Sequence, residues 1–503
     1  MFKINPLLIV ALIVTGSIAI WGIVDTENLA QWAAETIEVQ FSSRAWFIML
    51  TVSGLLIVSL FLAISKYGEI KLGADDDQPE FSTVSWLSML FAAGMGVGLL
   101  YWGTAEPLTH YLAVSEVEDS RRAADAALFI TNFHWGMHAW AIYALTGLVI
   151  AYFGFRLDCP NLVSAPLIRV YGKSTVTMVA GWLFDLMAIV AIAIGVGGSI
   201  AMGVFQIKGG IDVLMDVDSS GTSMSIAIFL VLCVAYTPPL LMDLSRGMAI
   251  LSNTAMAIAC GLMVFVLIAG PTQFIMGGII GAIGEYVSQV VVHGFRTYTF
   301  MDERTANWFH EWTLTYMVWW LAWAPFVGVF IARISKGRTI REFLFGVIVV
   351  PTVFSIFWFG VFGSIGFYAA LRTNLPILEL VQKDASRVMF FVLEQFPASR
   401  LTISAVVAAA FLFLITSVVS AAFVLGMFSS SGSLNPSRAV KLGWGVILGA
   451  LGLVMILSDS IAAIKSIIAL GALPFVFVVT ILVICLLRAL AVDEAAAIDR
   501  SKP

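Results

Sequence analysis

FAAGMGVGLLYWGTAEP, residues 91–107, is the stretch that decides the fold of this chain. Gly94, Gly96 and Gly98 alternate within an apolar run that is long enough to cross a bilayer. A glycine costs a helix about 1 kcal/mol relative to alanine, so three at this spacing predict a local break. In lipid, a break is tolerated only where it is buried in protein or lines a cavity. Backbone groups freed in this way can hold a carboxylate or a sodium ion.

The glycines have three other interpretations, of which a lipid-facing position by chance would not explain three glycines. Gly94 and Gly98 also form a GxxxG pattern, which is typical of a close helix–helix contact. A dinucleotide-binding loop requires a preceding strand and GxGxxG spacing, and here the third glycine comes one residue early. The dinucleotide loop is therefore excluded, and the choice between a break and a contact depends on the rest of the chain.

Composition identifies an integral membrane protein. Of the 503 residues, 60% are hydrophobic and only 12% are charged, and the mean hydropathy is +0.97, which excludes an ordinary soluble domain. The apolar runs are continuous over about 20 residues, which predicts helices rather than the alternating strands of a barrel. The four cysteines form no CxxC motif, and no basic patch suggests nucleic acid. We therefore expect an all-α polytopic protein that is not an enzyme and has no cofactor.

Twelve transmembrane helices are predicted, and the first is interpreted as a retained helix rather than a signal peptide. The short loop with Arg333, Lys336, Arg338 and Arg341 indicates that both termini are cytoplasmic, in the cytoplasmic (inner) membrane. The predicted spans are 6–24, 45–64, 84–102, 127–153, 176–204, 224–242, 250–270, 313–332, 344–370, 401–427, 439–458 and 464–487.

The spans divide into two blocks of five. Residues 1–83 hold two additional N-terminal helices and an amphipathic segment, 28–41, expected on the outer surface. The blocks are 84–270 and 313–487, separated by an outer interfacial helix (284–298) and loop within 271–312, and followed by a short cytoplasmic tail, 488–503. An odd number of spans gives the blocks opposite orientations. Pro325 predicts that the first helix of the second block is also interrupted. Paired broken helices in inverted halves indicate the central site of a transporter.

Aromatic side chains gather in two of these spans. Trp135, Trp140 and Tyr143 fit within one face of the fourth span, and Trp320 and Trp323 precede Pro325 in the eighth. Converging aromatic faces would bind a quaternary ammonium by cation–π contact, worth about 2 kcal/mol when desolvated. An interfacial belt or simple packing is the alternative for any single tryptophan.

Polar side chains within the spans suggest further sites. Thr416 and Ser417, beside the carbonyls freed near Ala92 and Met95, would form an all-oxygen cavity suited to sodium. Asp185, inside the fifth span, is either a functional carboxylate or a buried structural partner. His134 and His138 lie one turn apart without a nearby Glu or Cys in the motif, so we expect hydrogen-bonded packing rather than a metal site.

Three motifs closely resemble the betaine/choline/carnitine transporter family: GMGVGLLYWGTAEP, FHWGMHAWAIYAL and WWLAWAPFVGVFIARISKGRTIREF. The resemblance runs from about residue 45 to 470. It implies a LeuT-like core of two inverted five-helix repeats, and commonly a homotrimer. It also implies an aromatic box with Trp323 just below it on the cytoplasmic path, and a sodium site that combines backbone carbonyls with two hydroxyls. The box residues are Trp135, Trp140, Tyr143 and Trp320. The carbonyls are those of Ala92, Met95 and Phe413, and the hydroxyls those of Thr416 and Ser417.

The resemblance also bears on the substrate. Proton-driven choline carriers of the family tend to have Asp at the position of Gly98, so glycine there fits a zwitterion. The carboxylate of such a substrate would lie on the broken-helix stretch formed by Gly94, Met95, Gly96 and Gly98. The expected function is sodium-coupled import of a quaternary-ammonium or sulfonium zwitterion, such as glycine betaine. The alternatives are a sodium-independent exchanger of carnitine-like substrates and a transport-inactive membrane sensor.

This chain departs from the family pattern at several positions. Val418 and Val419 follow the hydroxyl pair where Ala and Asp are frequent, and the tail after Arg488 is short. Ile192 and Val196 stand where some sodium-coupled members carry threonines. A second sodium would need oxygen ligands there, so we expect one sodium per substrate.

Overall fold

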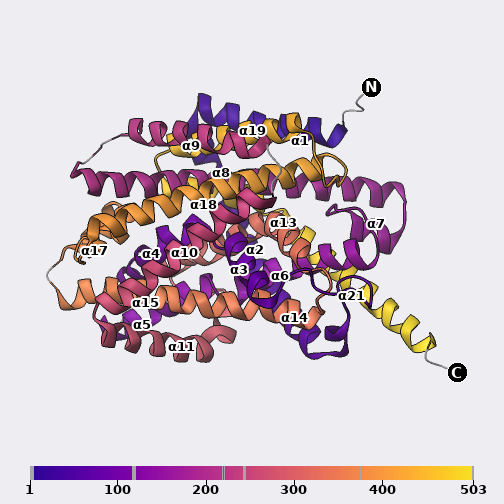
Figure 1. The fold of residues 1–503 in the computed structure, drawn as a ribbon, viewed down its shortest axis with the longest axis horizontal. Coiled ribbons are helices and arrows are strands. Elements are labelled where there is room, and N and C mark those ends of the chain that lie inside the picture. Colours follow the sequence, from indigo (N-terminus) through magenta and orange to yellow (C-terminus); the bar gives the residue numbers. More distant parts are fainter. Residues whose placement is uncertain are drawn as a thin grey trace.

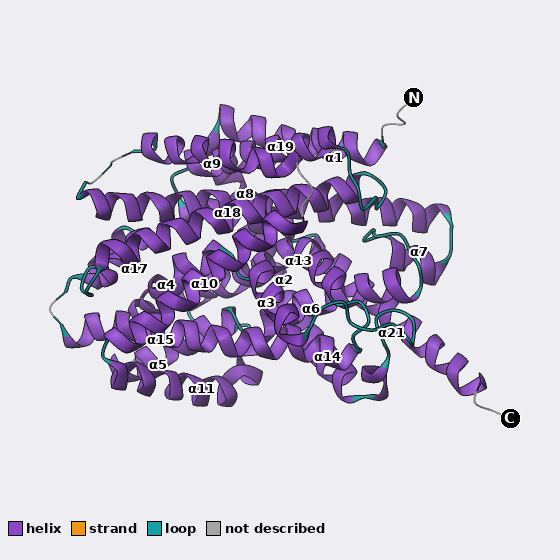
Figure 2. Cartoon of the chain, viewed as in Figure 1, coloured by secondary structure: helices purple, strands orange, loops and turns teal. Residues whose placement is uncertain are grey.

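The computed structural model describes residues 5–115, 120–217, 219, 221–241, 245–373 and 375–500. These residues are organised as helices without any named strand (Figure 2), and Lys71 and Thr339 form an isolated antiparallel bridge. Twelve helices are long and apolar enough to cross a membrane, which confirms the predicted all-α polytopic class. They span Pro6–Val24, Thr26–Ile64, Arg122–Arg156, Thr175–Met215, Ser223–Leu241, Ile250–Ala269, Thr272–Gly294, Glu303–Ile334, Ile340–Arg372, Ser399–Ser429, Arg438–Leu457 and Phe475–Asp493.

The N-terminal helices begin at side-chain caps. Asn5 accepts a hydrogen bond from the Leu7 amide to begin α1 (Pro6–Val24), and Asp25 accepts from the Asn28 amide to begin α2 (Thr26–Ile64). The amphipathic stretch 28–41 is thus the first part of α2 and continues directly into the apolar second span. No Gly or Pro interrupts the helix between the amphipathic stretch and residue 45.

The predicted break in the glycine stretch is confirmed. Helix α3 (Thr83–Gly94) ends and α4 (Val97–Ser115) begins on either side of Met95 and Gly96, which are not helical. None of the three glycines has a positive φ angle. Their role is therefore to leave space for neighbouring side chains rather than to provide left-handed backbone.

A second interruption divides the predicted fourth span. It separates α5 (Ser120–His134) from α6 (Met137–Ala151) at Trp135 and Gly136. A Cβ at Gly136 would lie 2.2 Å from the hydroxyl of Tyr286, and that hydroxyl accepts a hydrogen bond from the Met137 amide at 2.7 Å. Tyr286 belongs to α11 (Thr272–Gly294), so a side chain distant in sequence occupies the gap and satisfies a freed amide.

The expected interruption at Pro325 was wrong. Helix α13 (Thr315–Ile334) continues through Pro325, which removes a single backbone donor that the rest of the helix tolerates. The irregular part of this span lies further upstream. It is a π-helical turn, η3 (His310–Leu314), between α12 (Glu303–Phe309) and α13.

The segment between the two blocks also differs from expectation. The predicted interfacial helix 284–298 begins at Thr272 and ends at Gly294 as α11, and it meets the length and hydropathy of a span. Conversely, α3 and α4 are not among the twelve candidates, although 84–102 was a predicted span, because the break divides that segment. The division into inverted repeats stays a prediction.

The helices are stacked in layers around α8 (Thr175–Met215), which packs against α18 (Ser399–Ser429), α19 (Arg438–Leu457) and α20 (Ile461–Ala472). In Figure 1, α1, α9 (Ser223–Leu241) and α19 lie above α8 and α18, while α15 (Val350–Arg372), α5 and α11 lie at the bottom. Between them, α13 packs against α6, α3, α8 and α20. The remaining elements are η1 (Lys66–Glu69), η2 (Tyr152–Arg156), α7 (Ala165–Tyr171), α10 (Ser245–Ala269), α14 (Ile340–Leu344), η4 (Phe345–Val349), α16 (Ile377–Lys383), η5 (Ala385–Arg387), α17 (Val388–Leu393) and α21 (Phe475–Arg500).

Candidate functional site

Four of the predicted aromatic side chains meet in the middle of the molecule. The Trp320 ring of α13 lies 5.5 Å from Trp135, 5.8 Å from Trp140 and 4.8 Å from Tyr143, measured between ring centroids. The Trp135 and Trp320 rings are nearly perpendicular, at 85°. All four side chains are buried. The break before α6 places Trp135 in a turn, where it faces Trp320 from a different direction than the helical residues Trp140 and Tyr143.

The broken helix lies directly against this cluster. A Cβ at Gly94 would lie 2.3 Å from the Trp140 ring, and one at Gly98 would lie 2.9 Å from the Trp135 ring. A Cβ at Gly96 would meet Ser417 Oγ only at 3.8 Å. The glycines therefore allow the backbone to approach the aromatic rings and α18 closely.

A cavity adjoins the aromatic cluster and the break. None of its lining residues is charged. Of the predicted site residues, Trp140 and Met95 lie behind the wall rather than on it, and both are fully buried. The cavity is lined by Gly94, Gly96, Val97, Gly98, Trp102, Trp135, Tyr143, Ser199, Met202, Tyr316, Trp319, Trp320, Trp323 and Ser417.

The predicted sodium ligands come partly together. Thr416 Oγ1 donates a hydrogen bond to the Phe413 carbonyl at 3.0 Å, and Ser417 adjoins Gly96 at the break. Of these predicted ligands, Ser417 lies on the wall of this cavity, and its neutral hydroxyl is of the donor type that a hard cation prefers. Met95 is fully buried, and of Ala92 only its place in α3 is described. The ligand set itself stays a prediction.

A second, wider cavity meets the first at Ser417. Its wall includes Thr416 and Ser420 of α18 and Phe326 of α13, and it extends to a rim with Arg333, Arg438 and Lys441. Trp323 faces the first cavity and lies 5.5 Å from Phe326, so this pair marks the boundary between the two. The two cavities thus share Ser417, and the wider one is lined by the acidic residues Glu80 and Asp158 as well as by these basic ones.

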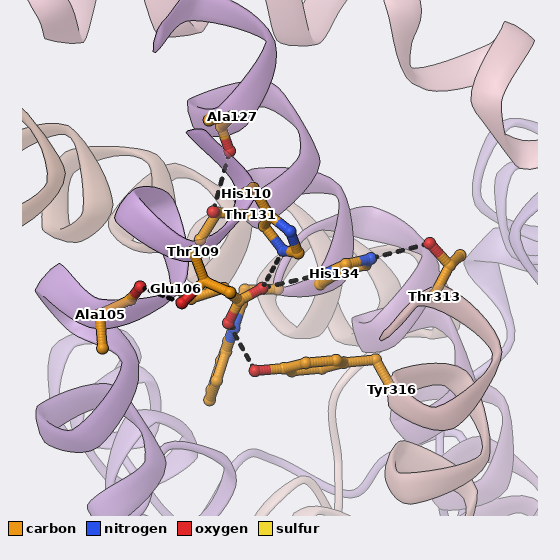
Figure 3. A network of polar contacts seen from close by, with 10 residues as sticks. Ala105, Glu106, Thr109, His110, Ala127, Thr131, His134, Thr313 and Tyr316 are labelled. Atoms are coloured by element: carbon orange, nitrogen blue, oxygen red, sulfur yellow. Dashed lines mark hydrogen bonds and ion pairs between the residues drawn. The ribbon is translucent and has the colours of Figure 1, made fainter. Parts of the chain in front are cut away.

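Glu106 is a fully buried carboxylate behind the cavity wall, and it was not among the predicted site residues. Glu106 of α4 accepts hydrogen bonds through Oε2 from Trp135 Nε1 at 2.9 Å and from the Tyr316 hydroxyl at 2.5 Å. Its Oε1 lies 2.9 Å from His134 Nδ1 and 3.4 Å from His110 Nε2. Figure 3 shows Glu106 at the centre of these contacts, with His110 and His134 on one side and Tyr316 on the other.

The histidines belong to this network in different ways. His134 also contacts Thr313 Oγ1 through Nε2, at 3.0 Å, so both of its ring nitrogens have partners. The expectation that no Glu joins the histidines was wrong, because Glu106 reaches His134 from α4. His138 is buried too, but its Nδ1 has no hydrogen-bond partner among the described residues. Glu106, His110 and His134 lie close enough to surround a metal ion. The donors already satisfying the Glu106 carboxylate make hydrogen bonding the simpler account of this cluster.

The model of the betaine/carnitine/choline family transporters matches residues 6–495. The chain belongs to this family. It is therefore a multi-pass membrane transporter rather than an enzyme, as the sequence predicted.

Several relatives of this transporter align over most of its length. The glycine betaine transporter OpuD of Bacillus subtilis (strain 168) is 37% identical over 496 residues, which cover 96% of this chain and 94% of the relative. The ectoine/hydroxyectoine transporter of Virgibacillus pantothenticus is 35% identical, with 90% and 89% covered. The high-affinity choline transport protein of Escherichia coli (strain K12) is 32% identical, with 92% and 69% covered. Close relatives thus carry both zwitterions and a cation.

The polar side chains among the remaining candidate residues are hydrogen-bonded within the protein. Asp185 accepts hydrogen bonds from the Ser164 amide at 2.9 Å and the Ser164 hydroxyl at 2.7 Å, just before α7, which favours the structural interpretation. Ile192 and Val196 are fully buried and apolar, and the Ser199 hydroxyl donates to the Gly195 carbonyl. No second cluster of side-chain oxygens is formed by these residues of α8.

The glycine stretch provides a matched pair of variants. Gly94→Ala should lower the stability of the folded transporter by about 1–3 kcal/mol, because the new methyl group overlaps the fully buried Trp140 ring. Gly96→Ala adds the same methyl group in ordinary van der Waals contact and should change stability much less. Thermal unfolding of both variants in detergent checks this difference. Equal melting temperatures would contradict the close approach of α3 to Trp140.

Proposed function

We propose that this transporter is a sodium-coupled secondary active importer of a quaternary-ammonium or sulfonium zwitterion, of which glycine betaine is the representative. The observation that carries the proposal is the cavity wall, which combines Trp135, Tyr143 and Trp320 with no charged residue. A methylated onium group cannot donate hydrogen bonds, and aromatic faces are the surfaces that attract it.

The anionic end of the substrate has a matching environment in the broken helix. Helix α4 begins at Val97, and the positive end of its helix dipole faces the break. Gly96, Val97 and Gly98 all line the cavity at this end of the helix. A zwitterion can therefore place its onium group among the aromatic rings and its carboxylate at the start of α4, without an acidic side chain in the wall.

Sodium coupling is proposed from the neutral oxygen atoms at the base of the cavity. The carbonyl of Phe413 and the hydroxyls of Thr416 and Ser417 would hold the ion, with carbonyls of the break completing the shell. We propose one ion per zwitterion, because Ile192 and Val196 offer no oxygen for a second. Reversal potentials in proteoliposomes measure the ratio, and two sodium ions per zwitterion would contradict it.

The orientation of the transporter follows from its charged rim. Arg333, Arg438 and Lys441 line the wide cavity, and basic residues concentrate on the cytoplasmic side of membrane proteins. We therefore propose that the wide cavity opens to the cytoplasm, that both termini are cytoplasmic and that the chain is in its inward-facing state. The LeuT-like repeat and the homotrimer are proposed from the family resemblance alone.

Trp320→Ala tests the aromatic site. Loss of one desolvated aromatic face should weaken glycine betaine binding by about 1–2 kcal/mol, which is roughly 5- to 30-fold in Kd. Trp320→Phe retains a face and should bind more tightly than the alanine variant. Isothermal titration of purified, correctly folded protein measures both. Unchanged affinity in Trp320→Ala would return Trp320 to a packing role.

Replacing Thr416 and Ser417 together by alanine tests the ion site. The sodium concentration for half-maximal uptake should rise at least tenfold, whereas the substrate KM at saturating sodium should change far less, because these hydroxyls serve the ion. Ser420→Ala, one turn further along α18, is the matched control. Uptake by the double variant with an unaltered sodium dependence would show that the ion binds elsewhere.

A further inference from the structure

Lys465 is a buried cation in an apolar helix. It lies in α20, and only 4% of its side chain surface is exposed. Its Nζ is 3.3 Å from the centroid of the Trp312 ring and 5.4 Å from that of Trp102. Within the described part of the chain it forms neither a hydrogen bond nor an ion pair. Burial of an ammonium group is costly, and the two aromatic faces, together with the charges of Glu311 and Glu106, compensate for it.

The rings that hold this ammonium group continue into the substrate cavity. Trp102 lines the cavity directly. Trp312 is stacked on Tyr316, with centroids 6.1 Å apart and planes at 15°, and Tyr316 also lines the cavity. Only one layer of aromatic rings therefore separates the positive charge of Lys465 from the space that a substrate would occupy.

Glu106 places a negative charge behind another part of the cavity wall. Its carboxylate lies behind Trp135, whose indole N–H it accepts, whereas Lys465 lies behind Trp102 and Trp312. Glu106 also accepts from Tyr316, which is stacked on Trp312, so the negative charge lies nearer Trp135 and Tyr316 and the positive charge nearer Trp102 and Trp312. A zwitterion with its onium group at Trp135 and its acidic end toward Trp102 is aligned favourably with both charges, and Trp102 lies on α4 one turn beyond Gly98.

We propose that Lys465 is a specificity-determining residue that favours zwitterions over onium cations lacking a carboxylate. The inference rests on the proposed function, because it assumes that onium compounds bind in this cavity. Lys465 attracts the carboxylate of a zwitterion through one aromatic layer and repels a bare cation. A unit charge roughly 10 Å away, at an effective permittivity of about 20, changes a binding constant by about tenfold.

The experiment compares Lys465→Met and Lys465→Gln with Lys465→Arg in the full-length transporter. Methionine and glutamine keep much of the length of the side chain without its charge, and arginine keeps the charge. Lys208→Gln is the matched control, because Lys208 pairs with Asp212 on α8 instead of contacting Trp102 or Trp312. Isothermal titration with glycine betaine and with choline gives the ratio of the two dissociation constants for each variant.

The expected result is a preference for glycine betaine over choline that falls about tenfold in Lys465→Met and Lys465→Gln. The preference should be retained in Lys465→Arg and Lys208→Gln. An unchanged ratio in both neutral variants, with betaine still bound, would overturn the role of Lys465 and leave the proposed function intact. Failure of the unaltered transporter to bind glycine betaine or choline would instead contradict the proposed function.

Discussion

The structure of the site depends on a carboxylate that is completely removed from solvent. A buried anion has to be surrounded by donors, because its desolvation is not compensated otherwise. Glu106 finds them on three separate segments: His110 in its own helix, His134 and Trp135 at the α5–α6 break, and Tyr316 in α13. The contacts at the α5–α6 break and in α13 each fix the position of that segment relative to α4. Since Trp135 and Tyr316 also line the cavity, the requirement to satisfy one anion defines the shape of the binding space.

Much of this arrangement follows from local sequence. The break at Met95 and Gly96 was predictable because glycine spacing within an apolar run has few explanations in lipid. The meeting of Trp135, Trp140, Tyr143 and Trp320 was predicted from two motifs. The wrong prediction at Pro325 has a physical reason: proline removes one donor, and whether a helix ends there depends on the packing around it. The turn at Gly136 depends on Tyr286, about 150 residues away along the chain, so no local pattern could indicate it.

The charged residues of the site were harder to recognise than the aromatic ones. Glu106 immediately precedes Pro107 and lies beyond the predicted span, so it resembled the end of a helix rather than the centre of a network. A signal was nevertheless present, because His110 follows one turn later on the same face. Lys465 lies at the first turn of a predicted span, where a lysine commonly extends to the interface. Only the tertiary positions of Trp102 and Trp312 reveal that its charge is kept inside.

The shared position of Ser417 in both cavities has a kinetic consequence. Under the proposed coupling, solute and ion leave toward the cytoplasm past the same hydroxyl group, so their departures are not independent events. Sodium that rebinds from the cytoplasmic side would keep the base of the cavity occupied and slow the exit of solute. The turnover rate would then fall as cytoplasmic sodium rises, even when the concentrations of solute and sodium outside the cell remain unchanged. A cell whose ion gradient is failing would thus lose net uptake through slowed release on its own side of the membrane, in addition to the loss of driving force.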